Sequence, residues 1–426
     1  MEKRYNILVF PCGSEIGLEI YRSLKYSIHI NLFGGNSVDD HGKFVYDNYI
    51  SNIPFFDNPN FVEVLKDIIF KYHIDAIYPA MDAVITKLSS FEAELGCKII
   101  GSPLATNEIC LSKAKTYNIL KDVITVPLIY SDLIKVKNYP IFMKPEVGYG
   151  TKGAKLINSF NEGLEHLNSF PSSLILDYLP GKEYTIDCFT DKGRNLLFSK
   201  GRIRRRINNG ISVNTIPVKE QNEEFRKIAL LINDKIHFRG AWFFQMKENI
   251  NKKYSLLEVA SRLGGSSSLF RNLGVNFALL SIYDAFNYDV KIFHNDYHIE
   301  LDRALNNKYK INIEFENVYI DFDDCLLIEN KVNTTLISLI YQFLNEGKKL
   351  ILITKHDKEI NQTLDEYRLT NIFDEIIHLE KGQMKYKFIK KSSSIFIDDS
   401  HTERLLVHEN LGIPVFAPDT LESLLN

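Results

Sequence analysis

Cysteine is scarce in this sequence, and long hydrophobic runs are missing. The five cysteines are widely separated and form no CxxC pair; they stand at positions 12, 97, 110, 188 and 325. Such spacing favours a reducing compartment and argues against both a disulfide framework and a structural zinc site. No apolar run approaches the roughly 20 residues that span a bilayer, and the run at residues 7–10 is too short for a secretion signal. We therefore expect a soluble, cytoplasmic protein that does not bind a membrane.

Neither sign of charge dominates the chain. The 54 acidic and 51 basic side chains leave a formal charge of -3, which argues against a general nucleic-acid-binding protein. A hydrophobic content of 45% and a charged content of 25% are typical of globular proteins. Because 426 residues exceed what one hydrophobic core supports, two to four domains are expected.

Two familiar glycine signatures of nucleotide binding are also absent. The turn GSEIG at residues 13–17 lacks the GxGxxG spacing of a dinucleotide site. It is interpreted first as a simple strand-to-helix turn and second as a contact with a small substrate. The glycine loop VGYGTKG at residues 147–153 lacks the spacing of a P-loop. A nucleotide site would therefore need another arrangement.

Residues 1–105 alternate between strand-like and helix-like segments. A buried strand at 5–10 leads through the glycine turn into a helix, and a second strand is expected at 28–33, ended by Gly34 and Gly35. The alternation continues to the end of this region. It predicts a Rossmann-like parallel α/β layer whose ligand crevice lies at the carboxyl ends of the strands.

Residues 106–300 have a different pattern, in which hairpin-like strands follow one another. A helical stretch at 108–120 precedes them, and a helical region at 276–288 follows them. The expected strands are residues 141–144, 154–157, 173–179, 183–189, 240–246 and 254–259. We predict antiparallel sheets here, then a polar linker at 301–316 and a third, parallel α/β unit at 317–426.

Lys144 and the glycines that follow it suit a polyphosphate. Gly148, Gly150 and Gly153 would let backbone N–H groups approach the phosphates, and the lysine adds a point charge. Taken alone, the loop is equally well explained as an ordinary hairpin turn. Glu258, in the apolar stretch YSLLEVASRLGG, is costly to bury unless a cation meets it, and a metal beside a phosphate would do so.

The order of further motifs decides between these readings. After the glycine loop come DYLPG with Glu183 close behind, the basic run KGRIRRR, Gln245, and Glu258 with Arg262. This ordered set resembles the ATP-grasp superfamily over roughly residues 1–300, with an N-terminal pre-ATP-grasp layer like that of the carbamoyl-phosphate synthetases. The resemblance implies that ATP activates a carboxylate as an acyl phosphate, which an amine then attacks.

The resemblance also assigns residues to ATP. These residues are Lys113, Lys144, Gly148, Gly150, Gly153, Asp177, Tyr178, Leu179, Glu183, Lys200 and Arg204. Lys144 would contact the α-phosphate, the glycine loop would cover the phosphates, and residues 177–179 would receive adenine. The glutamate of this set would take the ribose hydroxyls. One of Lys200, Arg202 and Arg204 would face the phosphates, and the sequence leaves open which one.

Magnesium is implied beside the phosphates, held by Glu258 and Gln245, with Arg262 as the catalytic residue that stabilises the transferring phosphate. The family commonly has EINxR where this chain has EVASR, so Ala260 stands where a second metal ligand is expected. Gln245 offers only a neutral oxygen. Either one metal is bound less tightly, or Ser261 or water substitutes, because magnesium keeps several waters readily.

The third unit ends three apolar strands with polar residues. Asp321 and Asp323 follow one strand, and Thr354 ends the next, KLILIT. Asp398 follows SIFI. Alternation along the first strand end puts its two aspartates on one side. Because parallel strands deliver their carboxyl ends to one edge, these residues are expected to share a crevice. An isolated pair such as Asp398 with Asp399 is more often a turn or a helix cap.

Together with Lys385, these residues resemble the haloacid-dehalogenase-like (HAD-like) phosphohydrolases over residues 317–426. The resemblance implies that Asp321 is the nucleophile and that Asp323 is the general acid and base. Thr354 and Lys385 would neutralise the phosphoryl oxygens. The short spacing between Asp321 and Thr354 leaves no room for a large cap, so the domain is expected to be uncapped.

Magnesium is implied at this second site too. It would be held among Asp321, Asp323 and Asp398, with Asp399 as a weaker candidate. Lys387 is the alternative to Lys385 as the lysine that neutralises the phosphoryl oxygens.

We therefore predict a bifunctional enzyme, an ATP-dependent carboxylate–amine ligase fused to a magnesium-dependent phosphatase. ATP and Mg²⁺ would be its cofactors. Small-molecule acids and amines would be its partners. If one of these substrates carries a phosphate, the phosphatase could act on the ligation precursor or on its product. One alternative is a phosphatase regulated by an ATP-binding module that does not turn over. Another is a C-terminal unit that serves only in docking or folding. The substrates and the oligomeric state, a homo-oligomer included, stay open.

Overall fold

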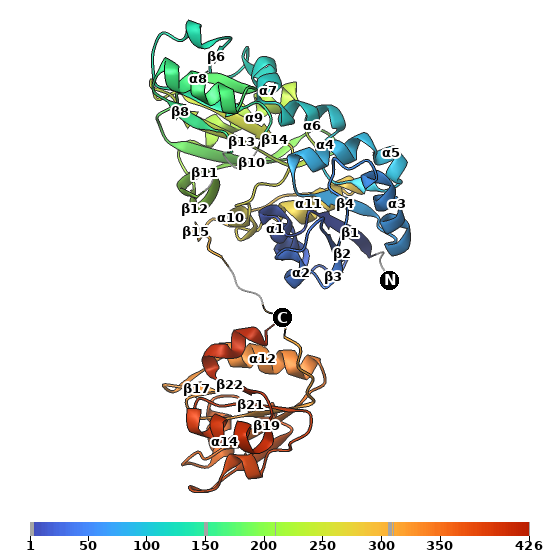
Figure 1. Ribbon diagram of the computed structural model, residues 1–426, viewed down its shortest axis with the longest axis vertical. Coiled ribbons are helices and arrows are strands. Elements are labelled where there is room, and N and C mark those ends of the chain that lie inside the picture. Colours follow the sequence, from blue (N-terminus) through green and yellow to red (C-terminus); the bar gives the residue numbers. More distant parts are fainter. Residues whose placement is uncertain (1–3, 149–151, 209, 306–308, 310, 426) are drawn as a thin grey trace. The chain divides into compact units, whose positions relative to one another are not determined.

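The computed structural model describes residues 4–148, 152–208, 210–305, 309 and 311–425. The chain divides into two compact units, Met1–Leu305 and Asn306–Asn426, and each is described by itself (Figure 1). Both mix helices with strands, and the sheets include parallel and antiparallel ones, so the predicted mixed α/β class is confirmed. Within the described ranges, no helix has the length and the apolar surface that crossing a membrane requires.

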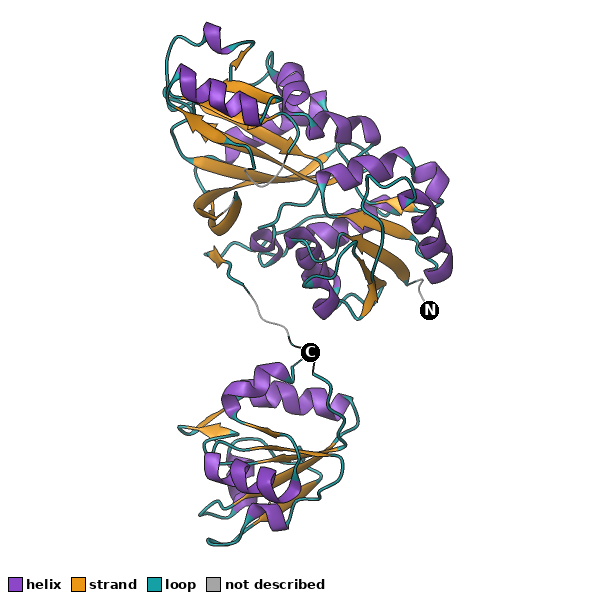
Figure 2. Ribbon diagram, in the orientation of Figure 1, coloured by secondary structure: helices purple, strands orange, loops and turns teal. Residues whose placement is uncertain are grey.

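A five-stranded parallel sheet of order β3-β2-β1-β4-β5 forms the N-terminal part of the first unit. Its strands are β1 (Tyr5–Phe10), β2 (Ile30–Gly35), β3 (Asn48–Ile50), β4 (Ala76–Pro79) and β5 (Lys98–Ile99). Its helices are α1 (Glu15–Leu24), α2 (Gly42–Val45), α3 (Phe61–Tyr72), α4 (Asp82–Ser90) and α5 (Glu92–Leu95) (Figure 2). The expectation that Gly34 and Gly35 end the second strand is wrong, because both residues pair with β3. A larger residue would not fit at Gly34, because an added Cβ would meet the Tyr46 ring at 2.4 Å.

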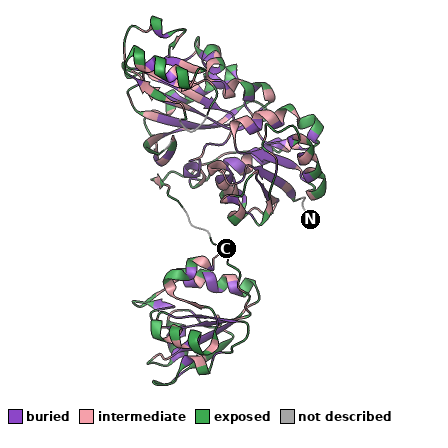
Figure 3. Ribbon diagram, in the orientation of Figure 1, coloured by how far each residue is buried: buried purple, intermediate pink, exposed green. Residues whose placement is uncertain are grey.

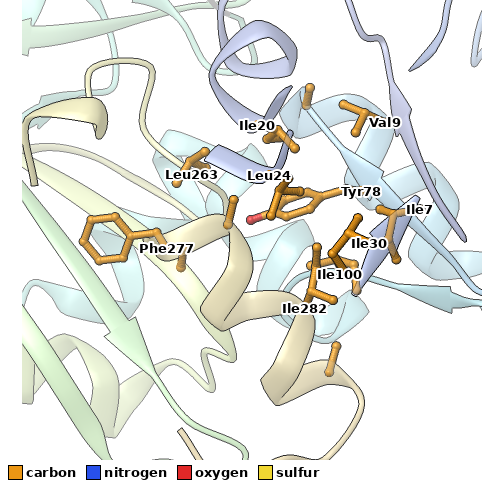
Figure 4. Packing of buried hydrophobic residues seen from close by; sticks show 14 of the residues in the cluster. Ile7, Val9, Ile20, Leu24, Ile30, Tyr78, Ile100, Leu263, Phe277 and Ile282 are labelled. Carbon is orange, nitrogen blue, oxygen red and sulfur yellow. The ribbon is translucent and has the colours of Figure 1, made fainter. Parts of the chain in front are cut away.

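The core of this layer is shared with a helix from much later in the chain. The central strands β1 and β4 are buried (Figure 3), and α11 (Phe277–Ala285) packs against this layer. Phe277 and Ile282 of α11 lie in one apolar cluster with Ile7 and Ile20 (Figure 4). Burying apolar surface of this kind stabilises the fold by about 25 cal/mol per Å². The predicted boundary between the first two domains therefore lies inside a unit with a shared core.

Two antiparallel sheets complete the first unit. The smaller sheet has the order β6-β9-β7-β8 and consists of β6 (Ile129–Tyr130), β7 (Ile141–Pro145), β8 (Lys155–Ile157) and β9 (Ser173–Asp177). The larger sheet has the order β14-β13-β10-β11-β12-β15. It consists of β10 (Glu183–Thr190), β11 (Leu196–Asn208), β12 (Ile211–Pro217), β13 (Gly240–Glu248), β14 (Tyr254–Ala260) and β15 (Leu301–Asp302). The remaining elements are α6 (Leu104–Leu111), α7 (Lys113–Leu120), η1 (Leu133–Lys135), α8 (Phe160–Ser169), α9 (Asn222–Lys235) and α10 (Ser268–Arg271).

Two details differ from the sequence-based expectation. The helical stretch at 108–120 is divided into α6 and α7 by Ser112, which is extended and accepts a hydrogen bond from the Lys115 amide at 3.1 Å. A serine in this position caps the helix that follows it. In addition, β15 pairs with β12 at the start of the stretch predicted as a linker.

A five-stranded parallel sheet of order β20-β19-β16-β21-β22 forms the centre of the second unit. Its strands are β16 (Asn317–Ile320), β19 (Lys349–Thr354), β20 (Glu375–His378), β21 (Ser394–Ile397) and β22 (Val415–Phe416). The other elements are the hairpin β17 (Leu327–Ile328) and β18 (Lys331–Val332), α12 (Thr334–Asn345), α13 (Ile360–Glu366), η2 (Lys385–Lys387), α14 (His401–Leu411) and η3 (Pro418–Ser423). Val318 packs with Leu339 of α12 on one face, and Tyr319 packs with Val407 of α14 on the other. Only the hairpin and α12 lie between β16 and β19, where every residue is described.

Candidate functional site

The larger antiparallel sheet aligns polar residues in rows across its strands. In the middle row Glu258 of β14 lies opposite Gln245 of β13, and Gln245 lies opposite Thr185 of β10. Thr185 in turn lies opposite Arg202 of β11. Residues two positions apart along a strand share a face, so Arg204 continues this face on one side and Ala260 continues it on the other. Strand register, rather than closeness in sequence, brings these residues together.

A cavity of about 250 Å³ is lined by both antiparallel sheets. Its apolar wall includes Phe142, Leu176 and Leu257. Its lining contains these residues that the sequence assigned to ATP or metal: Lys113, Lys144, Gly148, Asp177, Tyr178, Leu179, Glu183, Arg204, Gln245 and Glu258. Gly150 lies outside the described residues, and neither Gly153 nor Lys200 belongs to this lining. An apolar wall beside a charged end suits a ligand with a flat ring and a polyanionic tail.

A second cavity of about 280 Å³ shares part of that wall. The lining common to both cavities is Lys113, Gly148, Arg204, Gly210, Gln245 and Glu258. The second cavity extends to the N-terminal layer through Glu15 and Asp82 and to the loop after β14 through Arg262 and Gly264. The two cavities therefore meet at a charged wall, on which a group can pass from one ligand to another.

Lys144 is held by partners that the sequence did not reveal. Its Nζ donates to Tyr117 Oη at 2.8 Å and to the Leu257 carbonyl at 2.9 Å. Burial lowers the pKa of Lys144 to about 8, and the charge of Glu258 opposes this shift. Tyr117 stands one helical turn after Lys113 on α7, and this spacing is the signal that could have found it.

The glycine loop contains glycines with different roles. The Lys113 Nζ donates to the Gly148 carbonyl at 3.2 Å, and an added Cβ at Gly148 would come no closer than 3.5 Å to another residue. Gly153 has a φ of +73°, and an added Cβ there would meet Phe170 and Pro145 at 2.9 Å. Gly153 is therefore required by the packing of the loop.

In the segment at 177–179, one side chain binds the main chain, and all three residues line the first cavity. The Asp177 carboxylate accepts a hydrogen bond from the Leu128 amide at 2.8 Å. Burial raises the pKa of Asp177, and that hydrogen bond opposes the shift. Because this carboxylate already joins β9 to the chain before β6, Tyr178 and Leu179 are the members of the segment free to meet a ligand.

The three basic residues of β11 have three different surroundings. Arg204 lines both cavities, and Arg202 lines the second, where it pairs with Asp187 at 2.7 Å. Lys200 contacts His294 and belongs to neither lining. Of the three alternatives left open by the sequence, Arg204 is therefore the one that borders both cavities.

Arg262 lines the second cavity and bridges to the N-terminal layer. Its Nη2 lies 2.8 Å from Asp82 Oδ2, and its guanidinium carbon lies 5.4 Å from the centre of the Phe243 ring. No sequence pattern selects Asp82, which begins α4 and approaches Arg262 only through the tertiary fold. Ala260 lines this cavity as well, whereas Ser261 donates to Asn107 at 2.6 Å and belongs to neither lining.

A cluster of acids surrounds one lysine in the second unit. Lys385 Nζ lies 2.7 Å from Asp321 Oδ1 and 2.6 Å from Asp398 Oδ2. Carboxylate oxygens of Asp321, Asp398 and Asp399 lie within 4.8 Å of one another, a spacing that suits a bound cation. Burial raises the pKa of Asp321 to about 7, although Lys385 opposes this shift. Lys387, the alternative lysine, is exposed.

Asp323 has a partner that sequence reasoning missed. Its carboxylate lies 2.9 Å from His356 Nδ1, and His356 Nε2 lies 3.1 Å from the Thr363 hydroxyl. The buried Thr354 accepts a hydrogen bond from the His356 amide at 3.1 Å. His356 stands two residues after Thr354, which ends β19, and this position in the sequence could have pointed to it.

Comparison with known proteins identifies the fold of the first unit. Residues 169–305 match the family model described as ATP-grasp in the biosynthetic pathway with Ter operon. The D-alanine–D-alanine ligase of Fusobacterium nucleatum is 27% identical over 150 residues, covering 34% of this chain and 52% of that protein. The ligase of the same name from Thermotoga petrophila is 30% identical over 116 residues, covering 24% of this chain and 37% of that protein. The chain thus spans about half, or less, of these relatives.

Solved structures give the same fold. The biotin carboxylase domain of a 2-oxoglutarate carboxylase from Hydrogenobacter thermophilus, in complex with MgADP, has a TM-score of 0.58 at 16% identity, covering 69% of this chain and 72% of that one. An N5-carboxyaminoimidazole synthetase from Staphylococcus aureus, complexed with ADP, has a TM-score of 0.57 at 16% identity, covering 69% and 80%. An L-amino acid ligase from Bacillus licheniformis has a TM-score of 0.53 at 17% identity, covering 67% and 75%. These structures and this chain therefore share one fold, and residues 169–305 match the ATP-grasp model.

Proposed function

We propose that the first unit is an ATP-dependent carboxylate–amine ligase. The observation that carries this proposal is the wall common to the two cavities, in which Lys113, Arg204 and Glu258 border both. ATP in the first cavity would present its terminal phosphate at this wall. A carboxylate in the second cavity would meet the phosphate there. The ADP complexes of structures with the same fold, and the ligase relatives, support this assignment.

The chemistry follows from the charges at the wall. A carboxylate oxygen would attack the terminal phosphorus, the bond from that phosphorus to ADP would break, and an acyl phosphate would form. An amine would then attack the acyl carbon, release phosphate and leave an amide. Arg204 and Arg262 would stabilise the negative charge on the moving phosphate, and holding both reactants in place supplies much of the rate.

Magnesium fits this wall. Glu258 and Gln245 face one another, and together they would hold the ion with phosphate oxygens and water completing its shell. The ion would neutralise phosphate charge when it is bound. Among the described residues, no group of three His, Cys, Asp or Glu side chains includes Glu258, so the protein would contribute few of the ligands.

The test is an assay of products. The protein would be incubated with MgATP and a panel of acids and amines, and the amides and ADP would be measured by mass spectrometry. We expect ADP and one amide in equal amounts, and neither from Glu258→Gln. ATP binding without ADP release, whatever acid and amine are added, would instead favour an ATP-binding module that regulates the second unit.

A second activity is proposed for the C-terminal unit, that of a HAD-like phosphatase. The contacts of Lys385 with Asp321 and Asp398 support it. Asp321 would attack the phosphorus of a phosphate monoester, and Asp323 would give a proton to the departing alcohol oxygen. Asp323 would then take a proton from the water that releases phosphate from Asp321. A magnesium ion at Asp321, Asp398 and Asp399 would supply positive charge against the phosphate.

Phosphate release from an aryl phosphate tests this second proposal. We expect magnesium-dependent turnover that Asp321→Asn abolishes, with Lys387→Met as a matched variant that keeps it. Equal phosphate release by the wild type and Asp321→Asn would mean that the unit serves in docking or folding.

A further inference from the structure

Several residues whose buried polar atoms lack partners line the second cavity. Ten buried side-chain nitrogen and oxygen atoms in the described part of the chain lack a hydrogen-bond partner. The residues that hold five of them line this cavity: Thr185, Arg202, Arg204, Ser212 and Arg262. A folded protein rarely leaves buried polar groups unpaired, and such groups call for a ligand, an ion or water.

All five atoms can donate a hydrogen bond. Three belong to guanidinium groups, which have no acceptor, and two belong to hydroxyls. Arg202 uses its Nε for Asp187 at 2.7 Å, whereas its Nη1 has no partner. The hydroxyl of Thr185 and that of Ser212 have none either. A set of donors of this kind is matched by an oxyanion, because guanidinium groups form strong charge-assisted hydrogen bonds with carboxylate and phosphate.

The sheet register places Thr185 and Arg202 away from the wall that the two cavities share. In the row Glu258, Gln245, Thr185 and Arg202, the proposed metal ligands occupy one end and the two unpaired donors occupy the other. Thr185 and Arg202 line the second cavity but not the first. They are therefore placed to hold a part of the substrate other than the group that receives phosphate.

The loop after β14 makes room for these donors. An added Cβ at Gly264 would lie 2.9 Å from Asp187 Oδ1 and 3.3 Å from Arg202 Nη2. Gly264 thus covers the buried ion pair without displacing it. The side chains of Thr185 and Arg202 are 1% and 3% exposed, so water outside the cavity does not satisfy them.

We propose that Thr185, Arg202 and Ser212 form a subsite for an oxyanion group, a carboxylate or a phosphate monoester, that a substrate carries besides its reacting group. This inference rests on the proposed ligase function and adds the substrate class to it. A phosphate monoester bound here would also be a compound of the class that the C-terminal unit is proposed to hydrolyse. A dicarboxylic acid would satisfy the same donors by the same chemistry.

The experiment measures binding rather than turnover. Phosphoethanolamine, inorganic phosphate, succinate and ethanolamine would be titrated into the full chain by calorimetry, with and without magnesium and a non-hydrolysable ATP analogue. To remove the C-terminal unit's own phosphate binding, every protein would carry Asp321→Asn. If phosphoethanolamine and inorganic phosphate bind more tightly than succinate, the substrate is phosphorylated. If succinate binds more tightly than they do, the substrate is a dicarboxylate.

The matched variants are Thr185→Val, Ser212→Ala and Ser255→Ala. Ser255 also has a buried hydroxyl without a partner, is 1% exposed like Thr185, and lines neither cavity. We expect Thr185→Val and Ser212→Ala to weaken the oxyanion probes by about tenfold, the loss expected for a hydrogen bond to a charged group. Ser255→Ala should stay within about twofold of the parent. In the absence of probe, none of the three should unfold at a lower temperature, because each loses only an unpaired hydroxyl.

Three results would overturn the proposal: ethanolamine binding in preference to every oxyanion, no oxyanion binding at all, or equal affinity in the parent and both cavity variants. The proposed function fails separately. A chain that does not bind the ATP analogue is no ATP-dependent ligase, whatever the oxyanion titrations show.

Discussion

Lys144 Nζ lies 2.8 Å from the phenol oxygen of Tyr117, in a wall of the first cavity. Tyr117 also donates to the Leu257 carbonyl at 2.6 Å, so the lysine and the phenol share one acceptor. This arrangement fixes the ammonium group before any ligand arrives. It also removes the group from water, and the pKa of Lys144 falls to about 8 as a result of burial.

Nucleotide affinity is expected to depend on pH because of this lysine. Below pH 8 the ammonium group is charged and meets the phosphates at no further cost. Above pH 8 the empty protein is neutral at Lys144, so binding must take up a proton, and affinity falls by up to about tenfold per pH unit. Calorimetry of ATP-analogue binding in buffers of different ionisation enthalpy measures both effects. Lys144→Met should bind more weakly and lose the proton uptake; an unchanged uptake would assign the proton to another group.

The glycine loop supports a second prediction, on stability. Gly153→Ala would force a side chain into a backbone with positive φ and against Phe170 and Pro145. We expect a loss of about 1–3 kcal/mol in the free energy of unfolding. Gly148→Ala would make only ordinary van der Waals contact, with Pro145 at 3.5 Å, and should cost much less. Thermal unfolding of the two variants compares them directly, and equal losses would contradict the different roles assigned to these glycines.

The sequence predicts some parts of this architecture much better than others. Lys144, Glu258 and Asp321 were selected from the sequence because each puts a charge inside or at the end of an apolar strand, where it demands a partner. The choice among Lys200, Arg202 and Arg204 needed the positions of the cavities, because alternation alone puts all three on one face of β11. The hydroxyls of Thr185 and Ser212 carry no signal in sequence, because threonine and serine are ordinary residues of strands.

Tertiary contacts account for the other omissions. Asp82 is 180 positions from Arg262 and approaches it because α4 packs on α6, and α6 packs on β14. The division of residues 1–300 into two domains followed from a change in the expected secondary structure near residue 105. One apolar cluster nevertheless contains residues from both sides of that boundary. Tyr117 and His356 stood close to predicted residues, yet only the fold shows that their side chains turn to Lys144 and Asp323.

Magnesium binding to the second unit is expected to strengthen with pH. Burial raises the pKa of Asp321 to about 7, so below that pH the folded protein holds a proton there that a free carboxyl would release. Stability without metal should therefore fall as pH rises from about 4 to 7. Magnesium must replace the proton, so its stabilising effect should grow over the same range. Thermal unfolding with and without Mg²⁺ at pH 5 and 7.5 would measure it, and Asp398→Asn should reduce it at both pH values.

Ala260 lies two residues after Glu258 on the same face of β14 and lines the second cavity. Ala260→Asn would add a carboxamide oxygen beside the proposed metal carboxylate, and oxygen ligands are those that magnesium prefers. We expect the Mg²⁺ concentration that half-saturates ADP release to fall. Ala260→Val, of similar bulk but without the oxygen, should not lower it, which separates an added ligand from a change of packing. If the asparagine and valine variants need as much magnesium as the wild type, position 260 does not reach the ion, and phosphate oxygens and water with Glu258 and Gln245 complete the site.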